Sequence, residues 1–385
     1  MKKDIKVYLV AGEPSGDLLG SRLIRALKSK TDGKSSYYGV GGDTMKEEGL
    51  DSLFNITDLA VMGLAEVIPS IPKVLKRIKE TVEDIKLHKP DVIITIDSWG
   101  FTGRINKALK KEKLDIPQIH YVAPQVWAWK KKRAKTMHKD VDCLLTLLPN
   151  EPKYFTPYGL ETHFVGHPVI EGGASKGDKK ALCEKYNVPK NKTLITLLPG
   201  SRHNEVQSLL PIYIKLAEEL YNENKRYHFL LPTVSTVSSY VKEVASKSSA
   251  PITLLQTEKD RYDAFASSKF AIAASGTVAL ELAIAKVPHL VSYIVSPITA
   301  YIARKILKIK YVNLSNILLN KFAVPELIQE DCTVENLKKT MFKFLDNKKK
   351  TDRQLKDFDR VKEKLGFGSQ TPSDKAADII LSKIK

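Results

Sequence analysis

The sequence of 385 residues contains little cysteine and no long apolar run. Its three cysteines, Cys143, Cys183 and Cys332, are far apart and form no CxxC or Cys/His spacing, so neither a disulfide framework nor a zinc site is indicated. No apolar run reaches the roughly 20 residues of a membrane-spanning helix, and no signal-peptide pattern precedes the first strand. We therefore expect a cytoplasmic protein that is soluble or lies on a membrane surface.

Acidic residues are the scarcer charged type, with 44 Asp and Glu against 62 Lys and Arg, which gives a formal net charge of +18. This excess predicts an anionic partner such as nucleic acid, a nucleotide or an acidic lipid. A lysine-rich proteome would produce much of the same bias. The composition is 43% hydrophobic and 28% charged, as in ordinary globular proteins, and the length predicts two domains.

The stretch from Lys6 to Lys28 predicts a strand, a glycine-bearing turn and a helix. The apolar run 7–10 is short enough for a buried strand, and two glycines and a proline interrupt the chain at 12–17. Apolar residues then recur at the spacing of an amphipathic helix. This is the opening of a doubly wound α/β domain, in which ligands bind at the carboxyl ends of the strands.

Three polar side chains, Glu13, Ser15 and Asp17, lie in that first turn. One alternative is that Ser15 and Asp17 only cap the helix. Because one cap residue is enough, three such side chains favour a binding role.

The rest of the chain repeats the alternation of short apolar runs and helical patterns. Strands are expected at 37–40, 90–97, 118–122, 141–148 and 162–168 and, after a glycine-rich linker at 172–179, at 193–198, 227–231, 252–255, 270–274 and 288–295. The pattern predicts an α/β fold of two Rossmann-like doubly wound domains that face a cleft. The expected domains are 1–171 and 178–345, followed by a helical segment 346–385 whose last helix has Thr371 as its cap and Pro372 in its first turn.

The β-branched run from Pro90 to Ile96 ends in the carboxylate of Asp97. Since the carboxyl end of a parallel strand is where this fold class carries its chemistry, Asp97 is the best candidate for a general base. The alternative is that Asp97 caps the helix expected at 102–110.

The stretch from Ala60 to Arg77 is apolar at first and is then rich in cations. It predicts either a buried loop and helix or an exposed apolar patch beside Lys73, Lys76, Arg77 and Lys79 that lies on an anionic membrane. The pattern alone favours burial, because most apolar segments are core.

The second half contains two helix starts that suit a diphosphate. Residues 199–202, with the sequence PGSR, offer backbone N–H groups and the guanidinium of Arg202. Ser275, Gly276 and Thr277 offer N–H groups and hydroxyls, and Glu281 follows one turn later, where a carboxylate suits the two hydroxyls of a ribose. Such a site needs no metal to offset the charge of a leaving diphosphate.

Other candidate features remain open between a functional and a structural role. The aspartate pairs at 140–142 and 357–359 resemble the pair of metal-dependent sugar transferases, but their positions suggest coincidence. The histidines form no ligand pattern, and His120 and His167 either bond to substrate or satisfy the core. Trp127 and Trp129 either form a wall for an apolar or sugar ligand or pack against the core.

The order of several segments resembles the lipid-A-disaccharide synthase family of inverting glycosyltransferases, which have the two-domain GT-B fold. The resemblance covers about residues 7–329 and is carried by VAGEPSGD, LAVMGLAEV, PDVIITIDS, IHYVAPQVWAWKKKR, FVGHP, LLPGSR, ASGTVALELA and YVNLSNIL. It implies condensation of UDP-2,3-diacylglucosamine with 2,3-diacylglucosamine 1-phosphate (lipid X) to a β-1,6-linked disaccharide 1-phosphate and UDP, without metal or cofactor.

The resemblance also implies roles for single residues. Asp97 would take the proton from the acceptor 6-hydroxyl, with Glu13, Ser15 and Asp17 on the acceptor side. UDP would bind in the second half, at the residues Arg202, Ser275, Gly276, Thr277, Glu281 and Asn316. The apolar stretch would contact the cytoplasmic face of the inner membrane through Val67, Ile68, Ile71, Val74 and Leu75, and this changes our preference from burial to membrane contact. The final helices would cross back over the fold or exchange between subunits of a homodimer.

Two other functions are kept as alternatives. UDP-sugar epimerases or hydrolases of the same architecture would show no dependence on an acceptor. A non-catalytic basic module would bind RNA or anionic membrane, but aromatic residues are not interleaved with the basic ones and no nucleic-acid motif is present.

Overall fold

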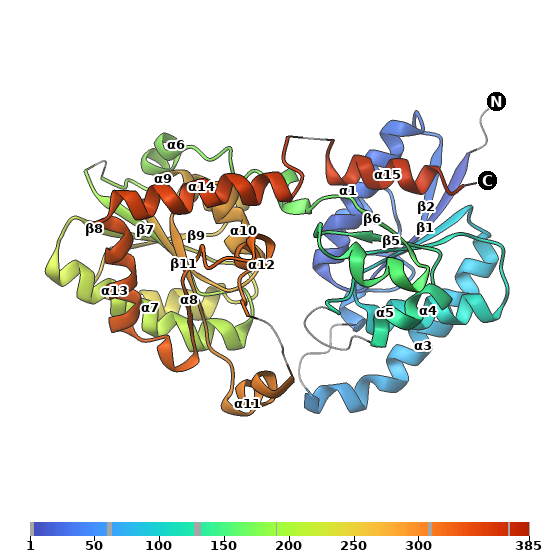
Figure 1. The fold of residues 1–385 in the computed structure, drawn as a ribbon, viewed down its shortest axis with the longest axis horizontal. Coiled ribbons are helices and arrows are strands. Elements are labelled where there is room, and N and C mark those ends of the chain that lie inside the picture. The colour runs from blue at the N-terminus through green and yellow to red at the C-terminus, as the bar shows by residue number, and fades with distance from the viewer. Residues whose placement is uncertain are drawn as a thin grey trace. The chain divides into compact units, whose positions relative to one another are not determined.

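The computed structural model describes residues 4–59, 64–126, 132–189, 191–306, 310–368 and 370–384 (Figure 1). The chain forms two compact units, one of Met1–Pro168 with Gly368–Lys385 and the other of Val169–Phe367. Each unit contains a six-stranded sheet whose strand pairs are all parallel. The prediction of two doubly wound α/β units is therefore confirmed.

The sheet of the first unit has the order β2-β1-β3-β4-β5-β6. Its strands are β1 (Ile5–Ala11), β2 (Ser35–Val40), β3 (Val92–Ile96), β4 (Gln118–Tyr121), β5 (Cys143–Thr146) and β6 (Glu161–Phe164). Its helices are α1 (Pro14–Lys30), α2 (Asp43–Glu47), α3 (Leu64–His88), α4 (Trp99–Lys111), α5 (Lys132–Thr136) and α15 (Pro372–Leu381).

Side chains that alternate along β1 separate the two cores of this unit. Val7 and Leu9 pack with α1 and α15, whereas Tyr8 and Val10 pack with α3 and α4. All residues of β3 are buried, as expected for a central parallel strand with helices on both faces. Because β1 and β3 are neighbours in register, the residues that follow Ala11 and Ile96 come to the same edge of the sheet.

The sheet of the second unit has the order β12-β11-β10-β7-β8-β9. Its strands are β7 (Thr193–Leu198), β8 (Tyr227–Pro232), β9 (Ile252–Leu255), β10 (Phe270–Ala274), β11 (His289–Tyr293) and β12 (Glu326–Ile328), of which β12 was not predicted. Its helices are α6 (Lys179–Lys185), α7 (His203–Glu223), α8 (Ser238–Ala245), α9 (Glu258–Ser267), α10 (Thr277–Ile284), α11 (Pro297–Ile306), α12 (Leu314–Leu319), α13 (Val334–Leu345) and α14 (Lys348–Lys364).

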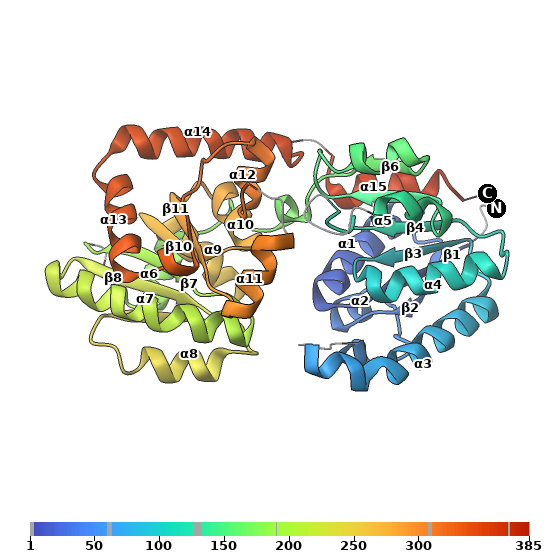
Figure 2. The same cartoon turned by 60° about the horizontal axis from the view of Figure 1, so that its bottom comes forward.

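The C-terminal segment, predicted as one piece from 346 to 385, divides between the units. Helix α14 packs in the second unit, where Phe358 is buried and stacks on His289. Helix α15 lies along α1 in the first unit and buries Ala376, Ala377 and Ile380 (Figures 1 and 2). The predicted start of α15 is confirmed, because the Thr371 side chain accepts a hydrogen bond from the backbone of Asp374 and Pro372 is the first helical residue.

None of the helices in the described ranges is both long and apolar enough to cross a membrane.

Candidate active site

The loop after β3 places Asp97 and Ser98 in the left-handed backbone region, with φ of 51° and 44°. Three hydrogen bonds hold the Asp97 residue there: its N–H donates to the Tyr121 carbonyl (2.8 Å), its carbonyl accepts from Thr102 Oγ1 (2.7 Å), and its Oδ1 accepts from the Ser98 N–H (2.7 Å). Two consecutive non-glycine residues in this region are strained, and such strain gathers at functional sites.

Glu13 of the first turn reaches the same loop. The Ser98 hydroxyl donates to Glu13 Oε1 at 3.0 Å. The backbone at Gly12 passes so close that a Cβ there would lie 2.7 Å from Ser98 Cβ. The two segments, whose bonded residues are 85 positions apart in the sequence, therefore form one compact group.

Burial raises the pKa of Asp97, the charge of Glu13 raises it further, and the Ser98 N–H opposes both. A carboxylate with a raised pKa accepts protons better than an ordinary aspartate does. The capping alternative finds no support, because the N-cap residue of α4 is Ser98 and its side chain makes no capping bond.

Asp17, which was also predicted on the acceptor side, is hydrogen-bonded within the first unit. It is buried, and its carboxylate accepts hydrogen bonds from Gly42 N (2.7 Å), Thr44 N (3.0 Å), Thr44 Oγ1 (2.7 Å) and Met45 N (3.1 Å). These donors belong to the start of α2, so Asp17 ties α1 to α2. Ser15 is exposed at the start of α1. Of the three predicted polar residues, Glu13 is the one that these hydrogen bonds connect to Asp97.

The neighbouring strand β4 also ends in strain, since Val122 has φ of 82°, which is an outlier for a β-branched residue. Before it, His120 is buried beside the edge of the Trp99 ring, with the ring centroids 4.7 Å apart. Its Nδ1 bonds to Thr95 Oγ1 at 2.8 Å, and burial lowers the pKa of His120 to about 3. His120 is thus a neutral core residue that contacts Thr95 and Trp99, which decides between the two roles that the sequence left open.

His167, the other histidine left open, is also buried, and burial lowers its pKa to about 4. Trp127 and Trp129 lie outside the described residues.

In the second unit, Arg202 follows β7 and is the N-cap residue of α7. Its guanidinium is exposed and donates to Glu205 Oε1 at 2.9 Å. Glu205 also accepts from the Tyr293 hydroxyl at 3.2 Å, which links the ends of β7 and β11. The arginine is thereby held at the carboxyl edge of the sheet, where it was predicted to bind a diphosphate.

The predicted SGT turn joins β10 to α10. Ser275 N donates to the Ser292 carbonyl (3.3 Å), and the position beside Gly276 is open, because a Cβ there would meet no atom within 4 Å. Thr277 begins α10, and Glu281 lies one turn along it, where its carboxylate accepts from Arg261 at 3.2 Å. The turn therefore offers backbone donors and open space at the end of β10, the strand that pairs with β7.

Asn316, predicted at the nucleotide, is fully buried and bonded within the protein. Its amide donates to Val324 O and Glu326 Oε1 (both 2.8 Å), and its Oδ1 accepts from Ala323 N and Val324 N (both 2.8 Å). These bonds close the loop after α12. Asn316 shapes the loop and has no bonding capacity left for a ligand.

On α3, Ile71 and Leu75 are 46% and 53% exposed, so burial, the alternative favoured by pattern alone, is wrong for them. Val74 is half-buried. The side chains of Val67 and Ile68 lie outside the described residues. Lys73 and Arg77 on the same helix bond to Asp58, and these two cations lower the pKa of Asp58. The described part of the stretch is an exposed apolar patch flanked by cations.

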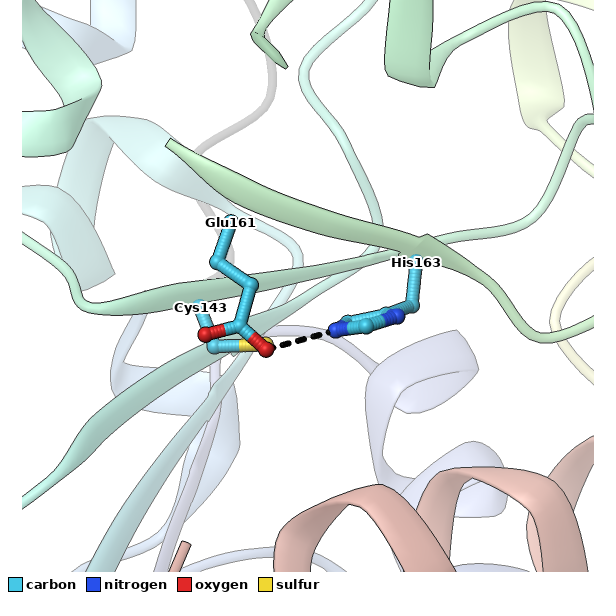
Figure 3. A group of neighbouring side chains, drawn as sticks. All are labelled: Cys143, Glu161 and His163. Atoms are coloured by element: carbon cyan, nitrogen blue, oxygen red, sulfur yellow. Dashed lines mark hydrogen bonds and ion pairs between the residues drawn. The ribbon is translucent and has the colours of Figure 1, made fainter. Parts of the chain in front are cut away.

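Cys143, Glu161 and His163 form a group with metal-ligand atoms within 4.8 Å of one another (Figure 3). Strand register brings them together, since Cys143 is opposite Glu161 and His163 follows two residues later. Glu161 is bonded to His163 (2.7 Å) and to Lys383 of the last turn after α15, and first Lys383 and then His163 lower its pKa. The lysine offsets the charge that would attract a cation, and we assign the group to attachment of the C-terminal segment.

Three of the four aspartates in the two pairs that resemble metal-binding motifs form ion pairs. Asp142 bonds to Lys110 (2.5 Å), Asp357 to Lys321 (2.6 Å) and Asp359 to Lys286 (2.7 Å). Their interpretation as coincidences of sequence is consistent with these contacts.

Comparison with known proteins identifies the family. A family model described as lipid-A-disaccharide synthetase matches residues 7–380. The chain belongs to the lipid-A-disaccharide synthetase family. It is 46% identical over 381 residues to the lipid-A-disaccharide synthase of Paramagnetospirillum magneticum, covering 98% of this chain and 97% of the relative. Lipid-A-disaccharide synthetases make the lipid A disaccharide as glycosyltransferases, and this activity class is the one predicted from the sequence motifs.

Solved structures support the same fold for this member of the synthetase family. MnaA of S. aureus, in a co-structure with UDP, aligns with a TM-score of 0.64 and 15% identity, covering 99% of this chain and 96% of its own. MurG of Acinetobacter baumannii aligns with a TM-score of 0.57 and 16% identity, covering 99% of both chains. At such identities the likeness establishes the GT-B fold alone.

Proposed function

We propose that the protein transfers the diacylglucosamine unit of UDP-2,3-diacylglucosamine to the 6-hydroxyl of lipid X, with inversion, and releases UDP. Membership of the synthetase family supports this reaction over the epimerase or hydrolase alternative. The observation that carries the mechanism is the Asp97 carboxylate, which lies at the carboxyl end of β3 in a strained loop and has a raised pKa.

In this proposal Asp97 accepts the proton of the acceptor hydroxyl as that oxygen attacks the anomeric carbon and the bond to the diphosphate breaks. The neighbouring Glu13 adds to the rise in the pKa of Asp97 and so increases the basicity of that carboxylate. In the second unit, Arg202 and the N–H groups of Gly276 and Thr277 stabilise the negative charge that develops on the diphosphate. Glu281 binds the ribose.

The acyl chains of both substrates require access to a lipid surface. We propose that the exposed apolar side chains of α3, Ile71 and Leu75, contact the cytoplasmic face of the inner membrane. A homodimer that exchanges its C-terminal segment remains part of this proposal. Within the described chain, α15 is attached to the unit that contains α1.

The experiment that tests the reaction measures UDP release from UDP-2,3-diacylglucosamine in detergent, with and without lipid X and without added divalent metal. We expect release that depends on lipid X. Release without the acceptor would instead identify a hydrolase or epimerase, and no release in either mixture would contradict the proposed reaction.

A further inference from the structure

Arg261 in the middle of α9 joins the candidate ribose-binding residue to the rest of the second unit. Its Nη2 donates to Glu281 Oε1 on α10 (3.2 Å), to Glu258 Oε1 (3.2 Å) and to the Tyr262 hydroxyl (3.5 Å). The Arg261 and Glu281 side chains are only 24% and 15% exposed. A largely buried carboxylate is costly without a compensating charge, and the guanidinium of Arg261 supplies a positive charge 3.2 Å from Glu281.

The ion pair with Glu281 also affects the pKa of Arg261. Burial works to lower the pKa of Arg261, but the charge of Glu281 and the neighbouring acceptors raise it overall. A guanidinium is also a rigid, planar donor, and its contact with Glu281 therefore restrains the direction as well as the charge of the carboxylate. The Arg261 Nε is buried and has no partner among the described residues, so the guanidinium is not saturated by the protein.

The support of Arg261 extends to the glycine-rich linker. Tyr262 donates to Glu258 Oε1 at 2.7 Å, and a Cβ on Gly177 would lie 1.9 Å from the Tyr262 carbonyl oxygen. The N–H of Asp178 donates to Asp263 Oδ1 at 2.8 Å. The turn of α9 that carries Arg261 is therefore packed closely against the linker segment of its own unit, which restrains the backbone at Arg261.

We propose that Arg261 is a positioning residue that orients the Glu281 carboxylate for the ribose hydroxyls and thereby sets the preference for ribose over 2′-deoxyribose nucleotides. This inference rests on the proposed function, in which Glu281 binds the ribose. Arg261 affects nucleotide affinity only through Glu281. Its loss therefore weakens the part of the affinity that depends on the ribose hydroxyls.

The test compares the Kd of UDP and of 2′-deoxy-UDP by calorimetry for the full-length protein and its variants. Hydrogen bonds to charged groups are the stronger ones, so we expect the unmodified protein to prefer UDP by about tenfold. Arg261→Gln should weaken UDP binding by about tenfold and leave 2′-deoxy-UDP binding nearly unchanged, and Arg261→Lys should have an intermediate effect. In a Glu281→Gln background, Arg261→Gln should add no further loss.

Lys185→Gln is the matched control. Lys185 on α6 pairs at 2.7 Å with Asp260, which is on α9 like Arg261, and no ion pair joins Lys185 to Glu281 among the described residues. It should leave both affinities unchanged. Equal weakening of UDP and 2′-deoxy-UDP by Arg261→Gln, or a full additional loss in the Glu281→Gln background, would overturn the positioning role while leaving the proposed function intact. Absence of UDP binding by the unmodified protein would instead overturn the proposed function and this inference with it.

Discussion

The carboxyl edges of the two sheets have the same architecture but differ in which residues adopt left-handed backbone conformations and in the polar groups they present. At the ends of β3 and β4, left-handed conformations fall on Asp97, Ser98 and Val122, whereas after β7 the left-handed residue is Gly200 with φ of 114°. The first unit holds a carboxylate in a strained and desolvated loop, and the second presents backbone donors and a paired arginine. In the proposed mechanism, backbone strain lies where a side chain reacts, whereas the proposed anion site uses backbone N–H groups and a paired cation.

The largest effect that would test this contrast is loss of the strained carboxylate. We expect Asp97→Asn to lower kcat by about a thousandfold, in the range of general-base contributions, with UDP affinity unchanged. In the unmodified enzyme, kcat should fall as pH drops through the pKa of Asp97, at a higher pH than for an ordinary aspartate, because that pKa is raised.

The same substitution gives a stability readout. A carboxyl whose pKa is raised on folding stabilises the protein at acid pH, and this contribution is lost as pH rises through the folded-state pKa. At neutral pH the ionised Asp97 therefore opposes folding, and Asp97→Asn should keep or raise the Tm. Asp142→Asn is the control and should keep full kcat. Asp142 directly precedes β5 and forms a partly exposed ion pair with Lys110. Retention of full transfer activity by Asp97→Asn would contradict the role of Asp97 as the general base.

The second largest effect concerns the paired arginine of the second unit. Arg202→Ala should weaken UDP binding by about 10- to 100-fold, because hydrogen bonds to charged groups contribute about 1.5–3 kcal/mol. The exposed Arg226 provides the control, since Arg226→Ala should leave the Kd of UDP unchanged. Calorimetric titration with UDP measures both, and an unaltered Kd for Arg202→Ala would exclude Arg202 from the diphosphate site.

The third prediction separates a structural carboxylate from a reactive one within the first unit. Asp17→Ala removes the acceptor of four hydrogen bonds at the start of α2. We expect a loss of about 3 kcal/mol, which lowers the Tm of the first unit by about 5–10 °C. Ser15→Ala, at an exposed position of the same turn, should leave the Tm unchanged. Equal melting temperatures for Asp17→Ala and the unmodified protein in calorimetric scans would contradict this role.

The smallest expected effect is on membrane contact by α3. Ile71→Ser and Leu75→Ser together should weaken binding to vesicles that contain anionic lipid by about tenfold, since each substitution removes part of an apolar side chain from the interface. Leu87, 77% exposed at the other end of α3, is the matched control, and Leu87→Ser should leave vesicle binding unchanged. Sedimentation with vesicles measures the partition, and equal losses for the two ends would contradict a localised contact.

The sequence predicted the position of Asp97 because a β-branched run is a local pattern and its last residue marks the strand end. It did not reveal the strain at Val122, since a backbone angle depends on the bond from Val122 N to the Leu145 carbonyl in another strand. The strand runs at 193–198, 252–255 and 270–274 agree with β7, β9 and β10 for the same local reason. Strand β12 was missed because it spans only Glu326–Ile328.

Two predicted site residues, Asp17 and Asn316, have hydrogen bonds within the protein that their local sequence does not reveal. Asp17 resembles a turn residue at the start of a helix, but its four bonds go to residues 42–45. Asn316 lies in a motif of the resemblance, but its amide is used by residues 323–326. Polar side chains at a site mouth look alike in sequence, and only the donors around them separate a ligand contact from a structural tie.

The division of the C-terminal segment affects how the chain is made. Helix α15 completes the core around α1, yet the whole second unit precedes it in the sequence. During synthesis, domains fold in order from the N-terminus. The first unit nevertheless lacks α15 until the whole second unit has been made, so the apolar side of α1 stays uncovered until then. The first unit matures last, and a chain interrupted before Pro372 would contain a complete second unit and a first unit with an uncovered, aggregation-prone apolar face.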